Sequence, residues 1–546
     1  MPGLPARTAR TSGGRGYRPA YRNVVFGAVG LAALIWGFVA RARAIGVINE
    51  DSFISFRYAR NLLAGDGLVF NPGGERVEGI TNLLWTLVVA GAGRLLSVPL
   101  PEASVTLGLI CGALTLAVAV AWGYGEISRS GYRSGYRSGG PGLGSLAASF
   151  IAPVALISAP GFAFYAVSGL EVAFFSLLLT AGLFCVCRGG SLSVVGSVLL
   201  GLAAMTRPEG ALVLGVAALC CAFAPGGVRE KILRVLAAGV PGGAVVAGFT
   251  AWRFLYYGSV LPNTAYAKAG GIEVVERWGL PYLANAAGGN WFVVAYLLVL
   301  GGALLDRDFL RRSLALLFIT PLWCAYVAYA GGDYMPFHRL LLPLLPALYV
   351  LGAAGFARVA ALLAADSGGY TRTAAVGGVL AAALVSPVFI QLPDLYEREK
   401  ARQEHDLQDN RDRREVAAWF RENDPNATIA RNGVGVVGYY TELEIVDMLG
   451  LNDRHIARNG RKSPATLPGH QSSDAAYVLD REPEYIMVAS LGPTYRFPGD
   501  RELVESGRLH EKYDLVSIEL SSGRKIKTFH HTGSPLASAS VKRIGG

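Results

Sequence analysis

The chain has 546 residues, of which 52% are hydrophobic and only 16% are charged, and its mean hydropathy is +0.38. Soluble globular proteins carry about 25% charged residues, so the composition excludes an ordinary soluble protein and indicates one that crosses a membrane several times. The formal net charge of +10 does not indicate a nucleic-acid partner, because the sequence has no basic stripe with interleaved aromatic residues.

Apolar segments of membrane-spanning length recur along the first 391 residues. Residues 1–23 contain five arginines and no acidic residue, and we expect this basic tail to lie in the cytoplasm. The apolar segment 82–98 is short and contains Arg94, so we predict a helix that lies at the membrane surface. The remaining segments predict a mostly α-helical transmembrane domain at 24–391, with about eleven spans. The predicted spans are 24–44, 102–124, 143–160, 170–187, 191–206, 209–224, 235–256, 291–305, 313–330, 340–362 and 373–391.

Basic residues indicate the orientation of these spans. With the N-terminus inside, the predicted cytoplasmic loops are rich in arginine and lysine, as in most membrane proteins. The opposite face then holds the first outer loop, residues 45–101, and the charged C-terminal region. We predict that residues 392–546 form an extracytoplasmic α/β soluble domain, with a helix at 414–423 and strands within 427–440 and 484–490. The predicted cytoplasmic loops are 126–142, 188–191, 225–234, 306–312 and 358–372.

The stretch "EDSFISFRYARNL" in the first outer loop combines two adjacent carboxylates with two arginines. If a helix begins near Asp51, the carboxylates of Glu50 and Asp51 complement its dipole, and Arg57 and Arg60 share one face. A solvated helix at the membrane surface explains the same pattern. Carboxylates beside a membrane nevertheless cost free energy unless they pair, bind a metal or take part in chemistry, which favours a functional site.

The other predicted outer loops contain further charged residues in short, unusual motifs. Acidic residues could act as a general base or hold a divalent cation (Mg, Mn or Ca) through oxygen ligands, and arginine or lysine could clamp a phosphate. Simpler explanations remain open, because Arg207 and Glu209 could form a local ion pair and a lone histidine is more often structural. The motifs are "SGLE" with Glu171, "TRPEG" with Arg207 and Glu209, "YYGSVLPNTAYAKAGG" with Asn263 and Lys268, and "GGDYMPFHR" with Asp333, His338 and Arg339.

Two other classes of membrane protein compete with an enzyme. A transporter or flippase typically places charges at mid-membrane and often shows inverted repeats, whereas the charges here lie at the ends of predicted helices and no such repeat is visible. A sensor with an external ligand-binding domain does not need so many charged outer loops. The pattern therefore favours chemistry at the outer membrane surface.

The motifs, in their order along the chain, resemble those of GT-C-fold glycosyltransferases that use polyprenyl-phosphate sugars. The resemblance includes the actinobacterial terminal arabinofuranosyltransferases of cell-wall arabinan (AftB-like), and it covers nearly the whole chain. Enzymes that transfer mannose or another hexose or pentose to protein, lipid or glycan remain an alternative. The segments that carry the resemblance are "EDSFISFRYARNLLAGDGLVFNPGGERVEGITNLLW", "SGLE", "TRPEG", "YYGSVLPNTAYAK", "GGDYMPFHRLLLP", "DMLGLNDRHIA" and "GHQSSDAAYVLDREPEYI".

This resemblance implies a multi-pass enzyme of the bacterial plasma membrane with a GT-C fold. It implies transfer of a sugar, arabinofuranose as the best guess, from a polyprenyl-phosphate donor to a cell-envelope glycan acceptor on the outer face. The catalytic motif falls on Glu50 and Asp51. Glu50 stands where the family pattern has a first aspartate, so Asp51 is the better candidate for the essential acid.

The resemblance also implies roles for the other charged and aromatic residues. A cation, if one binds, would involve Asp51 and Glu171. Tyr439 and Tyr440 could stack on the sugar rings of the acceptor, and core packing is the alternative for them. We expect the donor phosphate to bind Arg57, Arg60, Lys268, His338 and Arg339, with support from Glu171, Arg207, Glu209, Asn263 and Asp333.

Overall fold

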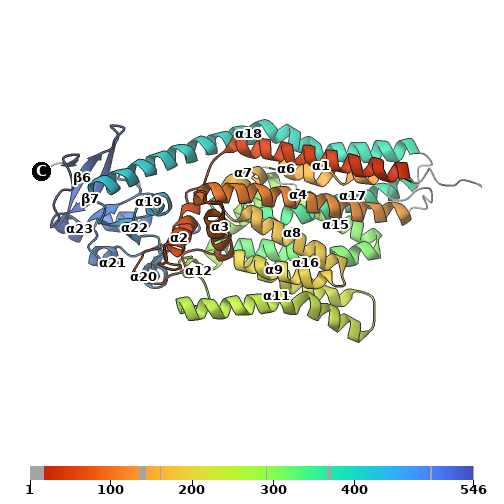
Figure 1. The fold of residues 1–546 in the computed structure, drawn as a ribbon, viewed down its shortest axis with the longest axis horizontal. Helices are drawn as coiled ribbons and strands as arrows, with labels where there is room; N and C mark the ends of the chain where they lie inside the picture. The colour runs from red at the N-terminus through yellow and green to blue at the C-terminus, as the bar shows by residue number, and fades with distance from the viewer. Residues whose placement is uncertain are drawn as a thin grey trace, which may run out of the picture.

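The computed structural model describes residues 17–133, 143–159, 161–289, 292–365, 370–491 and 495–544. A bundle of long helices occupies one end of the molecule and a sheet-containing region the other (Figure 1). The helices up to residue 365 are α1 Tyr17–Ile45, α2 Ser52–Ala64, α3 Leu83–Leu96, α4 Leu100–Arg133, α5 Leu143–Ala148, α6 Ile151–Ser158, α7 Phe162–Val167, α8 Val172–Arg188, α9 Leu192–Thr206, α10 Glu209–Cys220, α11 Val228–Tyr257, α12 Asn263–Tyr266, α13 Ile272–Val274, α14 Leu280–Gly289, α15 Phe292–Leu305, α16 Arg307–Tyr329 and α17 Leu345–Ala365.

Five described helices are long and apolar enough to cross a membrane, or six if the bent pair Ile272–Gly288 and Phe292–Leu305 is one span. Shorter apolar helices occupy four more of the predicted spans, at Leu143–Ser158, Val172–Arg188, Leu192–Thr206 and Glu209–Phe223. The chain is therefore a multi-pass membrane protein. The total of about eleven spans stays a prediction. The five long helices are Arg22–Ile45, Leu100–Arg129, Val228–Tyr257, Arg307–Tyr329 and Pro336–Leu362.

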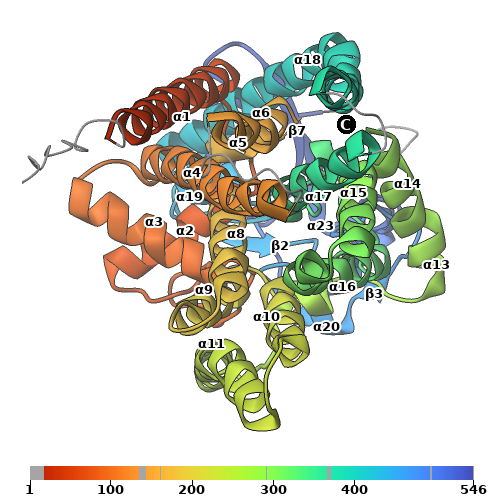
Figure 2. The ribbon, with the colours of Figure 1, turned by 90° about the vertical axis from the view of Figure 1, so that its right-hand side faces the viewer.

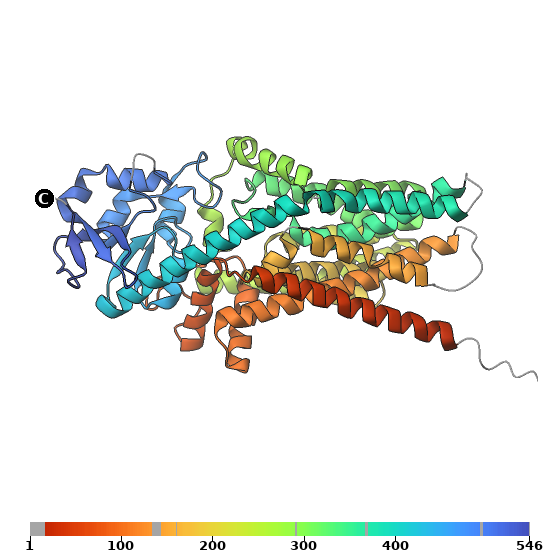
Figure 3. The ribbon, with the colours of Figure 1, turned by 90° about the horizontal axis from the view of Figure 1, so that it is seen from above.

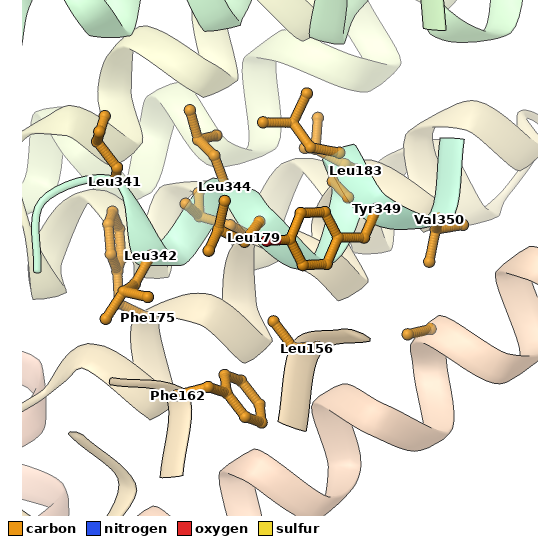
Figure 4. Close-up of a cluster of buried hydrophobic side chains, with 14 of the residues drawn as sticks. Leu156, Phe162, Phe175, Leu179, Leu183, Leu341, Leu342, Leu344, Tyr349 and Val350 are labelled. Carbon is orange, nitrogen blue, oxygen red and sulfur yellow. The ribbon is translucent and has the colours of Figure 1, made fainter. Parts of the chain in front are cut away.

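Close packing of apolar side chains holds the bundle together. Phe162, Phe175, Leu179 and Leu342 belong to one buried cluster, to which α7, α8 and the start of α17 all contribute (Figure 4). Seen along its length, the bundle has α11 at its edge (Figure 2). There a side chain on Gly242 of α11 would meet the carbonyl of Ser197 in α9, so glycine allows these two helix backbones to touch.

The helices α2 and α3 lie where the bundle meets the C-terminal region, and they run across the direction of the long helices (Figures 1 and 3). Helix α3 corresponds to the segment 82–98 that we predicted at the membrane surface, and that position stays a prediction. The long helix α18 Tyr370–Asn423 spans both parts of the molecule. The predicted domain boundary at 391/392 thus falls inside one continuous helix.

The C-terminal region is a mixed α/β structure. Its main sheet has the strand order β2-β1-β5-β7-β6-β8, in which β1 is parallel to β2 and β5 and the other pairs are antiparallel. The helix predicted at 414–423 is the end of α18. Elements after α18 are β1 Thr428–Arg431, α19 Gly435–Tyr440, β2 Glu444–Asp447, α20 Arg454–Asn459, β3 Arg461–Lys462, β4 Ser472–Ser473, α21 Ala475–Asp480, β5 Tyr485–Met487, α22 Pro498–Val504, α23 Gly507–Lys512, β6 Tyr513–Glu519, β7 Lys525–His531 and β8 Val541–Arg543.

One strand prediction in this region was partly wrong. The segment 427–440 contains strand β1 at its start, but residues 435–440 form the short helix α19. The valines of α19 are buried and pack against α2 of the first outer loop. Tertiary contacts therefore decide the structure of a segment whose β-branched residues alone favour a strand.

The orientation in the membrane can be tested by cysteine accessibility. Ser191 lies in a predicted cytoplasmic loop and Ser521 in the C-terminal region, and both are exposed. In a background without native cysteines, we expect Ser521→Cys, but not Ser191→Cys, to react with a membrane-impermeant maleimide in intact cells. Labelling of Ser191→Cys from outside would contradict the predicted topology, and permeabilised cells provide the control for its accessibility.

Candidate active site

Asp51 stands at the N-terminal end of α2, on a segment that the bundle holds firmly. The amide of Asn49 donates to the Ser168 carbonyl at 2.8 Å, and the side chain of Asn49 accepts from the Asp51 amide at 3.0 Å. The Asp51 carboxylate does not cap the backbone of α2 among the described contacts. It is turned instead towards Tyr334, whose hydroxyl donates to it at 2.9 Å.

Tyr334 belongs to the loop between α16 and α17, and the same loop contains an ion pair. Arg339 Nε donates to Asp333 Oδ2 at 2.6 Å. The backbone of this loop is strained, because Phe337 and His338 have φ angles of 59° and 52°, a region that non-glycine residues rarely adopt. The structure thus places the first outer loop and the "GGDYMPFHR" motif side by side, as the charge pattern predicted.

The environment of Asp51 shifts its acidity towards neutral pH. Burial, with the neighbouring Glu50 charge, raises the pKa of Asp51 to about 7, while Arg339 and the Tyr334 hydrogen bond oppose the shift. A carboxylate that titrates near the working pH can both take and release a proton, as general acid–base catalysis requires. Asp51 is therefore the strongest candidate for a base in the described structure.

Lys268 lies in the loop after α12, within electrostatic range of the same ion pair. Desolvation of the ammonium group lowers the pKa of Lys268, and the nearby Asp333 charge counteracts this effect. The residue as a whole remains exposed, and its ammonium has no recorded ion pair or hydrogen bond with the residues that the structure describes. The charges of Asp333 and Arg339 influence the pKa values of both Lys268 and Asp51. These four residues therefore form one electrostatic cluster.

A second charged network lies next to this cluster. Arg207 donates to Glu171 at 2.6 Å and to Glu209 at 3.0 Å, and Glu171 also accepts from Asn82 at 2.9 Å. The local pair in "TRPEG" is therefore real, but Arg207 joins it to the "SGLE" motif as well. The charge of Arg207 repels Lys268 and Arg339, while Glu209 attracts Lys268 and Glu171 attracts Arg339, so the network interacts electrostatically with the cluster around Asp333.

His338 lies against an aromatic ring at the edge of this cluster. Its imidazole packs edge-on against Tyr282, with 5.3 Å between ring centroids. The hydroxyl of the same tyrosine accepts from the Leu340 amide at 3.3 Å. His338 is thus part of the strained turn that orients Arg339, and binding of phosphate by its imidazole stays a prediction.

Arg57 and Arg60 contact the C-terminal region. Arg57 is fully buried, and it donates to the carbonyls of Phe70 at 2.6 Å and Leu443 at 2.7 Å. Arg60 donates to the Tyr439 carbonyl at 2.6 Å. Neither arginine is among the largest influences on the pKa of Asp51. The structure therefore favours a structural role for both, and binding of phosphate by them remains untested.

The remaining predicted site residues also join the two parts of the molecule. The side-chain amide of Asn263 donates to the carbonyls of Gly450, Leu451 and Asp453 at 2.9–3.1 Å. The rings of Tyr439 and Tyr440 pack against Phe53 of α2 with centroids 5.6 and 5.8 Å apart. The two tyrosines are half-buried in this contact, which favours core packing over acceptor stacking.

The candidate metal ligands do not fit a metal ion. Among the residues that the structure describes, no three His, Cys, Asp or Glu residues are grouped to hold one. Glu171 is neutralised by Arg207 and Glu50 by Arg413 of α18, so a cation at Asp51 would compete with two guanidinium groups.

Sequence reasoning missed three residues that hold the predicted ones in place. Tyr334 could have been found, because its hydroxyl lies inside the "GGDYMPFHR" motif. Asn82 begins the segment 82–98, for which the sequence predicts only a helix at the membrane surface. Arg413 gave no local signal, since it lies in a helix with many other charged residues and meets Glu50 only through the fold.

The chain is similar to known proteins in both fold and sequence. The apo structure of ArnT from Cupriavidus metallidurans aligns with 94% of this chain and 99% of its own, with a TM-score of 0.51 and 12% identity. The oligosaccharyltransferase of Archaeoglobus fulgidus aligns with 97% of this chain and 76% of its own, with a TM-score of 0.54 and 12% identity. The chain therefore has the GT-C fold that its motifs predicted.

Two relatives that are similar in sequence share one name. The terminal beta-(1->2)-arabinofuranosyltransferase of Mycobacterium tuberculosis (strain ATCC 25618 / H37Rv) is 31% identical over 251 residues, 44% of this chain. The protein of the same name from Corynebacterium glutamicum is 28% identical over 337 residues, 54% of this chain. The matches span 37% and 46% of those relatives' own lengths. A family model described as "Domain of unknown function (DUF8728)" matches residues 398–534.

The structural role of Arg57 can be separated from phosphate binding. Arg57→Met leaves the buried Leu443 carbonyl without its side-chain donor and removes one of the two side-chain donors to the Phe70 carbonyl, so we expect a loss of about 1–3 kcal/mol in the free energy of unfolding. Thermal unfolding in detergent should show this loss, whereas Arg76→Met, at an exposed position of the same loop, should have little effect. A normal unfolding temperature with a raised apparent KM for a lipid-phosphate donor would instead assign Arg57 to the phosphate.

Proposed function

We propose that the chain is a membrane glycosyltransferase that moves a sugar from a polyprenyl phosphate to a hydroxyl group of a cell-envelope glycan. The observation that carries this proposal is the cluster at the junction of the two parts of the molecule. Asp51, a carboxylate with a pKa near neutrality, lies within electrostatic range of the Arg339 guanidinium, and Lys268 interacts electrostatically with the same Asp333–Arg339 ion pair. A base and a phosphate-binding pair are the two elements that such a transfer needs.

The reaction requires one proton transfer and one displacement. The acceptor hydroxyl oxygen attacks the anomeric carbon of the donor sugar, and the bond from that carbon to the phosphate oxygen breaks. Asp51 takes the hydroxyl proton as the new glycosidic bond forms, and the polyprenyl phosphate leaves with the bonding electrons. Tyr334 holds the Asp51 carboxylate in one orientation through its hydrogen bond, which favours a fixed reaction geometry.

The cationic residues would stabilise the charge that develops on the leaving phosphate. Arg339 uses Nε for Asp333, while its two terminal nitrogens have no recorded hydrogen bond among the described residues. They could therefore donate to two phosphate oxygens at once. Lys268 would add a point charge from the opposite loop. Together they would replace the cations that nucleotide-dependent enzymes use.

The relatives support arabinofuranose as the transferred sugar. Both curated relatives are named terminal beta-(1->2)-arabinofuranosyltransferases, and the archaeal neighbour was also solved in complex with an inhibitory peptide and a dolichol-phosphate. A lipid phosphate with a long isoprenoid chain fits a site at the end of a membrane helix bundle. The donor would then be a polyprenyl-phosphate arabinofuranose, used on the outer face of a bacterial plasma membrane.

The proposal is tested by donor turnover in purified protein. We expect release of polyprenyl phosphate from polyprenyl-phosphate arabinofuranose in the presence of an arabinan acceptor, and slower or no release from the mannose, glucose and ribose analogues. Preference for another sugar would revise the assigned donor sugar and leave the assigned reaction class unchanged. Absence of turnover with every donor, in protein that elutes as a single species, would contradict the proposed function.

Asp51→Asn should abolish most of the activity. The substitution keeps the size of the side chain and removes its ability to take a proton, which typically costs about 10²–10⁴ in rate. The matched control is Asp66→Asn, because Asp66 lies in the same loop but is exposed. Turnover of Asp51→Asn at the wild-type rate would refute the assignment of the base.

The phosphate-binding roles of Arg339 and Lys268 predict unequal effects of charge-conserving substitutions. Arg339→Lys removes the planar fork that can hold two oxygens, so we expect an increase in the donor KM of about 10-fold or more. Lys268→Arg keeps a point charge and should have a milder effect. If Arg339 only holds its loop through Asp333, Arg339→Lys will lower thermal stability and leave the donor KM of the folded protein unchanged.

A further inference from the structure

The residue next to the candidate base is held by the C-terminal region. Glu50 Oε1 accepts from the Gly435 amide of α19 at 2.7 Å and from Arg413 Nη1 of α18 at 3.2 Å. Arg413 itself is oriented by Asp409, one helical turn earlier, at 2.8 Å. The Glu50 carboxylate is therefore tied to two elements more than 350 residues away in sequence.

The backbone of the same segment is held equally closely. The side-chain amide of Asn410, on the same helix as Arg413, donates to the Ile48 carbonyl at 2.6 Å. A methyl group on Gly435 would lie only 2.3 Å from the Glu50 carbonyl, so no side chain fits at that position. Contacts from α18 and α19 thus hold Ile48 and Glu50, two of the three residues that precede Asp51, and so fix the backbone from which its side chain projects.

We infer that Arg413 is a positioning residue of the active site, which fixes and neutralises Glu50 and thereby sets the orientation and electrostatic environment of Asp51. The inference rests on the proposed function, in which Asp51 is the base. It gives the C-terminal region a second task beside any contact with the acceptor, because the region completes the catalytic segment. It also gives Glu50 a role that requires a carboxylate but no contact with substrate.

The charges around Glu50 and Asp51 determine in which direction a substitution should shift the pH dependence of activity. Asp51 faces Glu50, Asp333, Arg339 and the Tyr334 hydroxyl. Glu50 also acts on Arg431 and His470 from the C-terminal region. The negative Glu50 raises the pKa of Asp51, and the positive charge of Arg413 acts on both carboxylates in the opposite sense.

Removing one partner at a time should therefore move the pH dependence in opposite directions. Arg413→Gln leaves the Glu50 charge uncompensated, so the acidic limb of kcat/KM should move to higher pH by about half to one unit. Glu50→Gln removes the negative charge and still accepts from Gly435, so the limb should move to lower pH by a similar amount. The double variant should have a midpoint near that of the wild type, because the two effects cancel.

Two further variants complete the experiment. Arg413→Lys keeps the positive charge. The midpoint of its acidic limb should therefore lie closer to that of the wild type than the midpoint of Arg413→Gln does. Arg411→Gln removes the same charge from an exposed position on the same helix, where the side chain hydrogen-bonds to the Leu407 carbonyl, and should leave the midpoint unchanged. All variants are measured as full-length purified protein, with the donor that the wild type uses.

The outcomes separate this inference from the proposed function. Opposite shifts for Arg413→Gln and Glu50→Gln support it. Equal midpoints in an active wild type and both single variants overturn the inference and leave the proposed function intact. If Arg413→Gln does not fold, Glu50→Gln and Arg413→Lys still decide, because an unmoved limb in Glu50→Gln overturns the inference. A wild type inactive on every donor overturns both.

Discussion

Compensation of buried charge is the constraint on which this structure depends. An uncompensated charge away from water costs several kcal/mol, so each charged side chain near the helix ends needs a partner from another segment. Arg207 joins two loops through Glu171 and Glu209, Arg253 of α11 pairs with Glu78 of the first outer loop at 2.6 Å, and Arg339 pairs with Asp333. The pairs Arg207–Glu171 and Arg253–Glu78 bring together loops that lie far apart in the sequence, whereas Arg339 and Asp333 pair within one loop.

The same constraint explains why the sequence indicated which charged loops meet but not all of their contacts. The low charge content of the chain makes each charged outer loop conspicuous, and "SGLE", "TRPEG" and "GGDYMPFHR" do meet beside Asp51. The GT-C fold was predicted from the resemblance of these motifs, in their order along the chain, to those of known glycosyltransferases, and the fold confirms it. Local sequence could further show that Asp333 and Arg339 are close enough in the chain to pair.

The contacts with the C-terminal region could not be predicted in this way. Arg57 and Asn263 looked like site residues because they carry polar groups next to the motifs, yet they donate to backbone carbonyls of residues 443–453. Nothing in their own segments indicates which carbonyls lie opposite them. The helix α19 was missed for the same reason, since packing against α2 overrides its preference for a strand.

The position of the bound lipid phosphate tests the account most directly. A cryo-electron microscopy map of the full-length protein with a polyprenyl phosphate should locate the phosphorus atom. The account predicts phosphate oxygens within hydrogen-bond distance of Arg339 or Lys268, with the Asp51 carboxylate facing the bond that breaks. A phosphate held by Arg57 or Arg60, or one on the far side of the bundle from Asp51, would contradict it.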